Sequence, residues 1–494
     1  MVPQGNTAPG ANPASGTFGR RFWLVAAVLA LLRLAAWDEI RGAEPDEKLV
    51  SDARHALLRG VSYFHSEVAV HGGYVYYVSL DGRTRLGEGV ASRDQVWVQP
   101  PGTPAVGLAM LRAYEVTQDP AVLKGARDAA EALIYGQLKS GGWRNAIDFD
   151  PQGTLAALYR NGRGKAKGAN TSTLDDGATQ TALLFLMRLD RATKFEDQPL
   201  HDAAKVGLDA LLAAQFSNGA FPQVWTGPSA EQPVKSASYP DYEWRTENRL
   251  KEYWNLYTLN DQLAGDVTDT LLAAHEVYGD ERVLAAIRRL GDFLILAQMP
   301  DPQPAWAQQY NYDMHPCWAR KFEPPAVTAN ESQDVLETLM TIFEKTGDRK
   351  YLAPIPKAVA YLKTCVLSDG QLARFYELRT NKPLYMDRNY QLTFDDGDVP
   401  THYGWKGKSR LESIEKRYND LVAGKPARPS RRTVKPDEAR RIVDALDDKG
   451  RWLTTYDGER ITGQPKFRAG EQYLSSETFI KNVERLADFL SANK

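Results

Sequence analysis

The stretch Ser140-Gly141-Gly142-Trp143 follows an amphipathic segment, and similar short motifs return along the chain. The others are His71-Gly72-Gly73-Tyr74, Asn218-Gly219-Ala220-Phe221, Pro302-Gln303-Pro304-Ala305-Trp306, Asp369-Gly370-Gln371-Leu372 and Lys449-Gly450-Arg451-Trp452. They are spaced by roughly 65–85 residues, which fits a repeating unit of two helices and a loop. Gln137 and Gln215 stand shortly before two of these turns. Glycine-aromatic turns are also common helix ends, but the helical content of the intervals favours a repeat.

The segments between the turns have the periodicity of amphipathic helices. Apolar residues recur at helical spacing in Pro120–Tyr135, Ala178–Thr193, Leu200–Gln215, Asp266–Tyr278 and Glu281–Gln298. Strand patterns are scarce, with Tyr74–Val78 and Gln95–Val98 as the best candidates. We therefore predict a mainly α protein, an α/α toroid. It would be an incomplete barrel of helical hairpins with short β segments, and its long loops would form a cleft.

The ends and two long segments interrupt this rhythm. Residues 1–43 combine a Gly/Pro/Ala-rich start with Arg20-Arg21 and an apolar stretch from Phe22 to Leu32, which is typical of a signal peptide. Residues 44–494 are predicted to be one catalytic toroid, with an exposed basic linker at 423–436 and C-terminal helices at 437–494. An apparent insertion, Trp225–Tyr257, and an irregular segment, Arg379–Arg410, are long enough to be functional loops.

Composition excludes several classes of protein. The chain has 494 residues, of which 43% are hydrophobic and 25% charged, and its formal net charge is −2. A nucleic-acid-binding protein would normally carry a basic surplus, so no nucleic-acid partner is expected. A membrane partner is expected only if the N-terminal segment stays uncleaved, and the predicted location is periplasmic or extracellular. Cys317 and Cys365 are too few for a disulfide scaffold and are expected to be buried thiols.

Acidic residues open two of the predicted helices. Asp175 and Asp176 precede the helix at Ala178, and Asp261 holds the comparable position in the next unit. An aspartate at a helix start is often only an N-cap. Two adjacent carboxylates, however, repel each other unless a cation or hydrogen-bond donors neutralise them. Because the ligands are oxygens alone, we predict Ca²⁺ as the cofactor.

Cations gather in later segments. Arg320 and Lys321 lie in an aromatic stretch that runs from Cys317 to Pro325, and Arg388 follows in Tyr385–Tyr390. Arginines that face an acidic, calcium-binding rim suit a carboxylated sugar polymer, because arginine binds carboxylates through two hydrogen bonds. Interhelical salt bridges would explain the same residues, and the sequence leaves both readings open.

The motifs resemble those of polysaccharide lyase family ten, the helical pectate lyases. The most specific match is Trp318-Ala319-Arg320-Lys321-Phe322-Glu323-Pro324-Pro325 with Glu331-Ser332. Further matches are Asp175-Asp176-Gly177-Ala178-Thr179, Thr258-Leu259-Asn260-Asp261, Phe375-Tyr376-Glu377 and Thr380-Asn381-Lys382-Pro383-Leu384-Tyr385-Met386-Asp387-Arg388. The resemblance implies an α/α toroid that cleaves polygalacturonate, an acidic polysaccharide, by calcium-assisted β-elimination.

The resemblance also implies roles for single residues. Arg320 would be the base that removes the C5 proton, and calcium and Lys321 would lower its pKa. Asp175, Asp176 and Asp261 would bind calcium, and Arg388 would clamp a substrate carboxylate. Lys321, Trp225 and His402 complete the expected substrate-binding set.

The chain departs from the family pattern at two places. It has Asp176 where the family tends to have asparagine, and His402 where an arginine precedes an aromatic stretch. A glycoside hydrolase that uses Asp175 with Asp261 as its carboxylate pair is therefore an alternative. A non-catalytic uronate-binding relative is another.

Overall fold

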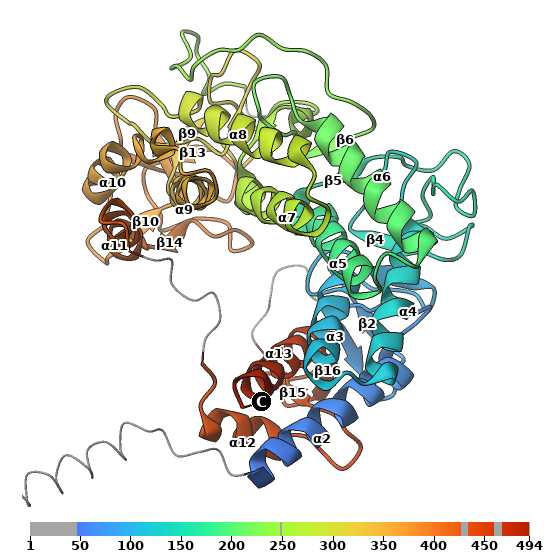
Figure 1. The fold of residues 1–494 in the computed structure, drawn as a ribbon. Coiled ribbons are helices and arrows are strands. Elements are labelled where there is room, and N and C mark those ends of the chain that lie inside the picture. The colour runs from blue at the N-terminus through green and yellow to red at the C-terminus, as the bar shows by residue number, and fades with distance from the viewer. Residues whose placement is uncertain (1–46, 248, 426–432, 459–466, 494) are drawn as a thin grey trace, which may run out of the picture.

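The helices form two curved layers that together make an open ring (Figure 1). The structure is a computed structural model, and it describes residues 47–247, 249–425, 433–458 and 467–493. The inner layer packs side by side in the order α13 (Ser476–Ala492), α3 (Thr103–Thr117), α5 (Ala178–Ala192), α7 (Leu263–Tyr278), α9 (Ala329–Thr346) and α11 (Leu411–Val422). The outer layer consists of α2 (Glu47–Tyr63), α4 (Pro120–Gly136), α6 (Gln198–Ala214), α8 (Glu281–Leu296), α10 (Ile355–Thr364) and α12 (Pro436–Asp444). The predicted mainly α toroid is confirmed, and its ring is open between α11 and α13 (Figure 1).

Aspartate caps begin three of the outer helices. The Asp119 carboxylate accepts a hydrogen bond from the Ala121 amide, Asp197 from that of Leu200, and Asp280 from that of Arg282. Such bonds satisfy amides that have no partner within the helix. These outer-layer aspartates are therefore explained by capping alone.

The glycine-aromatic turns connect each outer helix to the next unit with one repeated geometry. In the turn at 138–142, the Leu138 amide bonds the Gly142 carbonyl and the Gly141 amide bonds the Leu138 carbonyl. The same pair of bonds closes the turns at 216–220, 367–371 and 447–451, while the turn at 70–73 is one residue shorter and is closed by two bonds between Val70 and Gly73. Gly141 has a φ of 96°, a left-handed conformation that favours glycine. The sequence repeat is therefore a structural repeat.

The two turn glutamines tie neighbouring units together. The Gln137 amide donates to the carbonyls of Gly141 at 2.8 Å and of Ala203, in α6, at 2.9 Å. Gln215 repeats this with Gly219 at 3.0 Å and Ala286, in α8, at 2.9 Å. Both side chains are buried, so each bonds its own turn and the next outer helix away from water.

Short antiparallel strands link consecutive units along one rim. The strands are β1 (Tyr77–Ser79), β2 (Arg85–Leu86), β3 (Gln95–Trp97), β4 (Ala146–Asp148), β5 (Ser172–Thr173), β6 (Val224–Trp225), β7 (Tyr257–Thr258), β8 (Gln309–Tyr310), β9 (Ala326–Thr328), β10 (Gln371–Ala373), β11 (Phe375–Glu377), β12 (Pro383–Met386), β13 (Leu392–Thr393), β14 (Lys406–Lys408), β15 (Leu453–Thr455) and β16 (Gln472–Ser475). The sheets have the orders β15-β16-β1-β2, β13-β12-β11-β9, β3-β4, β5-β6, β7-β8 and β10-β14. A strand that precedes an inner helix pairs with the strand after the next turn, so the inner helix starts are brought together at this rim.

Several sequence predictions need correction. Strands are more numerous than predicted, because stretches of two to four residues are too short to show an alternating pattern. The segment 379–410 is largely irregular, as predicted, but it also contains β12, β13 and β14. Turns of 3₁₀ helix, η2 (Asp175–Gly177) and η4 (Asn260–Gln262), also precede α5 and α7. The remaining short elements are a π-helical turn, η1 (Phe64–Val68), and two 3₁₀ turns, η3 (Tyr253–Asn255) and η5 (Arg349–Leu352).

Other predictions fall partly outside the described residues. The predicted signal peptide lies there entirely, and so does half of the predicted basic linker, residues 426–432. α11 ends at Val422 and α12 begins at Pro436, so the predicted linker falls between these two helices. No helix among the described residues is both long and apolar enough to cross a bilayer. Cys317 and Cys365 are buried free thiols, as predicted.

Candidate active site

Two consecutive helix starts place acidic side chains next to each other. β5 leads into η2 and β7 into η4, and these two turns pack against each other. Asp176 in η2 has φ 46° and ψ 35°, and Asp261 in η4 has φ 50° and ψ 45°. Aspartate is one of the few residues other than glycine that adopt this left-handed conformation readily. The two turns therefore share one backbone shape and direct equivalent carboxylates to a common point.

The three predicted ligands form one cluster. Asp175, Asp176 and Asp261 each offer a carboxylate oxygen, and these oxygens lie within 4.8 Å of one another. Two oxygens that bind the same calcium ion at about 2.3–2.6 Å lie no more than about 5 Å apart, so this spacing fits calcium. No side chain caps α5 or α7, unlike α4, α6 and α8. The capping explanation therefore fails for these aspartates.

Amide side chains hold the carboxylates in place. Gln99 donates to Asp176 at 2.5 Å and Gln223 donates to Asp175 at 2.6 Å. Asn260 donates to the neighbouring Asp261. Each carboxylate thus has one donor, which leaves oxygens available for a cation. Glutamines at these positions were not predicted to be part of the site.

The electrostatics of the cluster also fit a cation. Burial, then the charges of Asp175 and Glu88, raise the pKa of Asp176 to about 6. Burial, then Asp176, Glu331 and Asp175, raise the pKa of Asp261 to about 7. The pKa of Asp175 is raised as well, with burial as the largest cause. Like charges crowded in a partly dry site disfavour ionisation, and a bound divalent cation reverses this effect.

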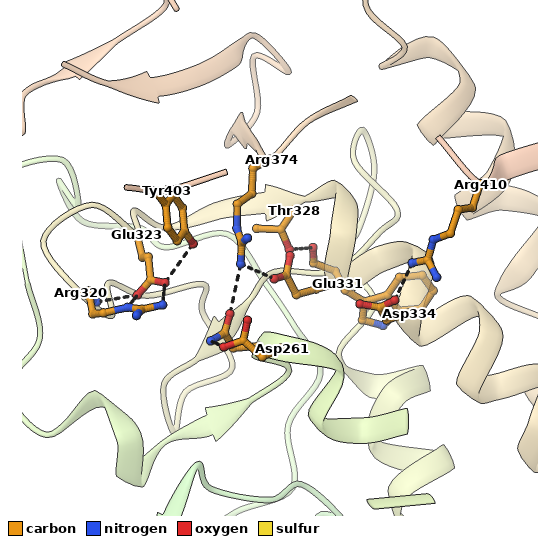
Figure 2. Close-up of polar contacts among 11 residues, drawn as sticks. Asp261, Arg320, Glu323, Thr328, Glu331, Asp334, Arg374, Tyr403 and Arg410 are labelled. Atoms are coloured by element: carbon orange, nitrogen blue, oxygen red, sulfur yellow. Dashed lines mark hydrogen bonds and ion pairs between the residues drawn. The ribbon is translucent and has the colours of Figure 1, made fainter. Parts of the chain in front are cut away.

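Arg320 is held by a carboxylate that the sequence analysis gave no role. Its Nε donates to Glu323 at 2.8 Å and its Nη2 donates to the other oxygen at 2.5 Å (Figure 2). The Tyr403 hydroxyl donates to Glu323 at 3.0 Å. Glu323 is buried, whereas the Arg320 side chain is 43% exposed. The buried carboxylate thus fixes the orientation of a guanidinium that stays partly exposed.

This pairing corrects the predicted electrostatics of Arg320. Burial lowers the pKa of the guanidinium, but the hydrogen bonds and charge of Glu323 outweigh burial, and the pKa of Arg320 is raised. Lys321 was predicted to lower that pKa. Its ammonium instead lies over the Tyr390 ring, 3.5 Å from the ring centroid. The protein itself therefore keeps Arg320 charged.

A second ion pair connects the arginine side of the site to the acidic cluster. Arg374 donates to Glu331 at 3.0 Å and to the side-chain oxygen Oδ1 of Asn260 at 3.3 Å. Its guanidinium lies 4.5 Å from the Tyr403 ring centroid. Figure 2 shows Tyr403 between Arg320 and Arg374, and Arg374 pointing toward the side of Asp261. Contacts thus run from the predicted base to the residue beside a predicted metal ligand.

The sequence carried partial signals for these missed residues. Glu323 stands three residues after Arg320, a spacing that a tight turn or a helix converts into contact. Glu331 belongs to the Glu331-Ser332 motif, and Tyr403 directly follows the predicted substrate-binding residue His402. Nothing in the sequence pairs Arg374 with Glu331, because the contact depends on the pairing of β11 with β9.

The other predicted substrate-binding residues lie in or near the loop that follows β12. Arg388 makes an exposed ion pair with Asp398 at 3.0 Å. His402 packs edge-on against Phe322, with 5.1 Å between ring centroids. In the described part of the chain, no contact joins Arg388 to the carboxylate cluster. The loop therefore covers the segment next to Arg320 without placing Arg388 at the cluster.

Trp225 does not fit its predicted role. Its side chain is buried, and its indole nitrogen donates to the Ser140 carbonyl at 3.1 Å. A ring that fills the core and bonds the neighbouring turn offers no face for a sugar to stack on. Trp225 instead joins one unit of the repeat to the previous one.

An acidic cavity of about 650 Å³ adjoins the cluster on the side of the inner helices. Asp176 and Asp261 line it together with Glu88, Asp266 and Asp269. The site therefore combines a helical toroid, a carboxylate cluster suited to a divalent cation, and a guanidinium held near that cluster. This combination defines a candidate metal-assisted enzyme with an anionic substrate.

Comparison with known families agrees with the motif resemblance. Residues 137–372 match the family model described as Pectic acid lyase. The matched region contains the three aspartates, Arg320 and Glu323. The resemblance to the helical pectate lyases is confirmed over this region, which carries the signature of a lyase family.

Several solved structures are similar to this chain at low sequence identity. A mutant family 10 polysaccharide lyase from Cellvibrio cellulosa, in complex with trigalacturonic acid, is 20% identical, with a TM-score of 0.44, and the match covers 65% of this chain and 99% of that one. The unmutated lyase from the same organism is 21% identical, with a TM-score of 0.45 and coverages of 63% and 95%. A D-mannose isomerase is 12% identical, with a TM-score of 0.43 and coverages of 91% and 99%. No match was found among curated protein sequences.

Proposed function

We propose that this protein is a pectate lyase that cleaves polygalacturonate by calcium-assisted β-elimination. The observation that carries the proposal is the cluster of Asp175, Asp176 and Asp261, whose oxygens lie within 4.8 Å of one another inside the region that matches the pectic acid lyases. The carboxylates do not cap their helices, and their pKa values are raised. Both facts are expected of a site that is completed by a cation.

The residues divide the chemistry between them. Asp175, Asp176 and Asp261 would hold calcium, which as a Lewis acid stabilises the charge that develops on a uronate carboxylate when the C5 proton leaves. The charge of Arg320 lowers the pKa values of Asp175 and Asp176, so the guanidinium lies near the cluster, and in its neutral form Arg320 would remove that proton. The electrons of the C5–H bond form the C4–C5 double bond, and the glycosidic oxygen leaves C4 with the electron pair of the broken bond and takes up a proton from water. Glu323 and Tyr403 fix the orientation of the guanidinium.

The raised pKa of Arg320 sets a condition on this mechanism. A base must be deprotonated, and Glu323 opposes deprotonation of Arg320. The fraction of neutral Arg320 therefore increases with pH throughout the alkaline range. Activity is accordingly expected to rise with pH above neutrality, while the cluster carboxylates are fully ionised.

The geometry argues against the glycoside hydrolase alternative. Paired catalytic carboxyl groups in such enzymes stand about 5–5.5 Å or about 6.5–9.5 Å apart. The oxygens of Asp175 and Asp261 approach more closely than this. Oxygens at that spacing suit a shared metal ion better than a sugar held between two catalytic carboxylates.

Asp261→Asn tests the metal site directly. It removes one charge with little change in shape, so calcium affinity measured by titration calorimetry should fall at least tenfold, and lyase turnover should fall with it. Asp280→Asn, at a capping aspartate of the outer layer, is the control and should change neither. Unaltered calcium affinity in Asp261→Asn would refute the proposed ligand set.

The substrate is tested with a panel of polymers. Polygalacturonate, alginate and a glucuronate polymer would each be incubated with calcium and with chelator, and unsaturated ends would be measured by ultraviolet absorbance. We expect product from polygalacturonate alone and only with calcium. Product from another uronate polymer instead would keep the lyase chemistry and change the substrate. Uronate binding without any turnover would favour the non-catalytic alternative. Export to the periplasm or outside the cell remains our proposal from residues 1–43.

A further inference from the structure

A smaller cavity, of about 350 Å³, lies on another side of the acidic cluster. It is lined by Asp175 together with Arg144, Trp254, Thr171, Thr173 and Gln99. Its volume is at the lower end of the range for small-ligand sites, so it suits one sugar residue better than a long segment of polymer. It contains a guanidinium and an indole ring, whereas no described residue that lines the neighbouring acidic cavity is a lysine or an arginine.

Arg144 is a cation with no partner. It is half-buried, and in the described part of the chain its side chain makes no ion pair or hydrogen bond. Its neighbour Trp143 is fixed, because the backbone amide bonds Thr179 at 3.1 Å and the indole bonds the Leu133 carbonyl at 2.8 Å. A partly desolvated guanidinium that gains nothing from its surroundings is costly unless it binds a ligand.

The repeat shows that Arg144 is peculiar to its turn. In the two following units, Pro222 and Ala307 stand directly after the equivalent aromatics, Phe221 and Trp306. The turn geometry therefore does not require an arginine. Of these three turns, the one at 138–142 is followed by an arginine, and this arginine lines the cavity next to Asp175.

Trp254 comes from the end of the Trp225–Tyr257 insertion, in η3. Its carbonyl accepts a hydrogen bond from the Gln223 amide at 2.9 Å, and the Gln223 side chain donates to Asp175 at 2.6 Å. The indole is half-buried, and within the described residues its nitrogen has no hydrogen-bond partner. The insertion thus fixes an aromatic ring beside a predicted metal ligand.

We propose that Arg144 and Trp254 form a binding subsite for one uronate residue of the substrate, next to the calcium site. Arg144 binds the carboxylate through two parallel hydrogen bonds, and the sugar ring stacks on Trp254. The proposal rests on the proposed function, because it assumes a uronate polymer. It gives the insertion a role, and it assigns the carboxylate-binding task to Arg144, at a place where Arg388 does not reach.

Arg144→Gln tests the subsite. With calcium present, the dissociation constant of trigalacturonate measured by calorimetry should rise about tenfold or more, as expected for the loss of a charge-assisted hydrogen-bonded pair. KM for polygalacturonate should rise, and kcat should change less. Arg144→Lys should recover part of the binding, because it restores the charge without the planar pair of donors. Calcium binding without sugar should be unaltered, which also verifies folding.

The control is Arg349→Ala. Arg349 is exposed and lies in η5, after the far end of α9, an 18-residue helix that rises about 27 Å from the site rim. This variant removes the same charge and should leave trigalacturonate binding unchanged. Equal weakening by Arg349→Ala and Arg144→Gln would reduce the effect to net charge and overturn the subsite.

Further outcomes separate the subsite from the proposed function. Trp254→Ala should weaken binding, while Trp254→Phe should retain most of it. Highly methyl-esterified pectin lacks the free carboxylate, so its binding should be insensitive to Arg144→Gln. If the wild-type protein cleaves polygalacturonate and Arg144→Gln binds and cleaves it equally well, the subsite is wrong and the function stands. If the wild type neither binds nor cleaves uronates, both proposals fail.

Discussion

Arg320 and Glu323 form the contact on which the proposed chemistry depends. Two parallel hydrogen bonds fix the guanidinium, and the buried carboxylate gives it a permanent counter-charge. The same counter-charge raises the pKa that a base needs to be low. Positioning and basicity are thus opposed at this residue.

Glu323→Gln should shift the pH profile. Without the carboxylate the pKa of Arg320 falls, so the alkaline rise in kcat/KM should move to lower pH. The maximal rate should drop, because an amide holds the guanidinium less firmly. The measurement is kcat/KM against pH for wild type and variant. A profile that moves to higher pH, or does not move, would show that Glu323 does not control the base.

Tyr403→Phe separates the role of the Tyr403 ring from the role of its hydroxyl. It keeps the ring that lies between Arg320 and Arg374 but removes the hydroxyl that donates to Glu323. We expect several-fold lower kcat with unchanged calcium affinity. Equal losses in calcium affinity and kcat would indicate a general structural defect instead.

At the scale of elements, η2 and η4 are two copies of one turn that bring repulsive charges together. The raised pKa values of Asp176 (about 6) and Asp261 (about 7) mean that, without a cation, the folded state takes up protons that the unfolded state does not. Stability therefore falls as pH rises from about 4, the ordinary aspartate value, to about 7.

Calcium should restore that stability. In chelator, the melting temperature should decrease between pH 5 and pH 8. The increase on adding calcium should be larger at pH 8, where the carboxylates are ionised, than at pH 5, where protons compete. Differential scanning calorimetry at both pH values measures this. A calcium effect that is equal at both, or larger at pH 5, would contradict the assignment of these carboxylates.

The turn glutamines should be structural. Gln137→Ala or Gln215→Ala leaves buried carbonyls without a donor, which should lower the free energy of unfolding by about 1–3 kcal/mol. Gln198→Ala, on the exposed start of α6, should change it by less than about 0.5 kcal/mol. Denaturant titration distinguishes these results. Equal losses of unfolding free energy at the buried and the exposed glutamines would show that the turn glutamines do not join the units.

At the scale of the whole molecule, helical periodicity and the glycine-aromatic turns were enough to predict the layered ring. They were enough because each unit repeats the same local signals. The short strands escaped prediction because pairs such as β5 with β6 are fixed by neighbouring units and not by a local pattern. Yet these strands bring Asp175 and Asp261 together, so the cluster was predicted only from the comparable positions of its residues in two units.

Side-chain pairing was the least predictable level. The Arg320–Glu323 contact reversed the predicted pKa direction, and the burial of Trp225 removed a predicted sugar contact. Arg144 and Trp254 come from different units and meet only in the folded ring. Such residues become visible when the loops of several units are placed at one rim.

The central claim is tested most directly by the ultraviolet absorbance of polygalacturonate incubated with the purified protein at alkaline pH. With calcium, we expect the absorbance to rise steadily as the new C4–C5 double bond forms. Chelator and Arg320→Ala should each abolish this rise. Arg320→Ala should still bind calcium with wild-type affinity. The proposal of calcium-assisted β-elimination would be wrong if the polymer stayed intact with calcium present. It would also be wrong if cleavage persisted in chelator or gave saturated ends.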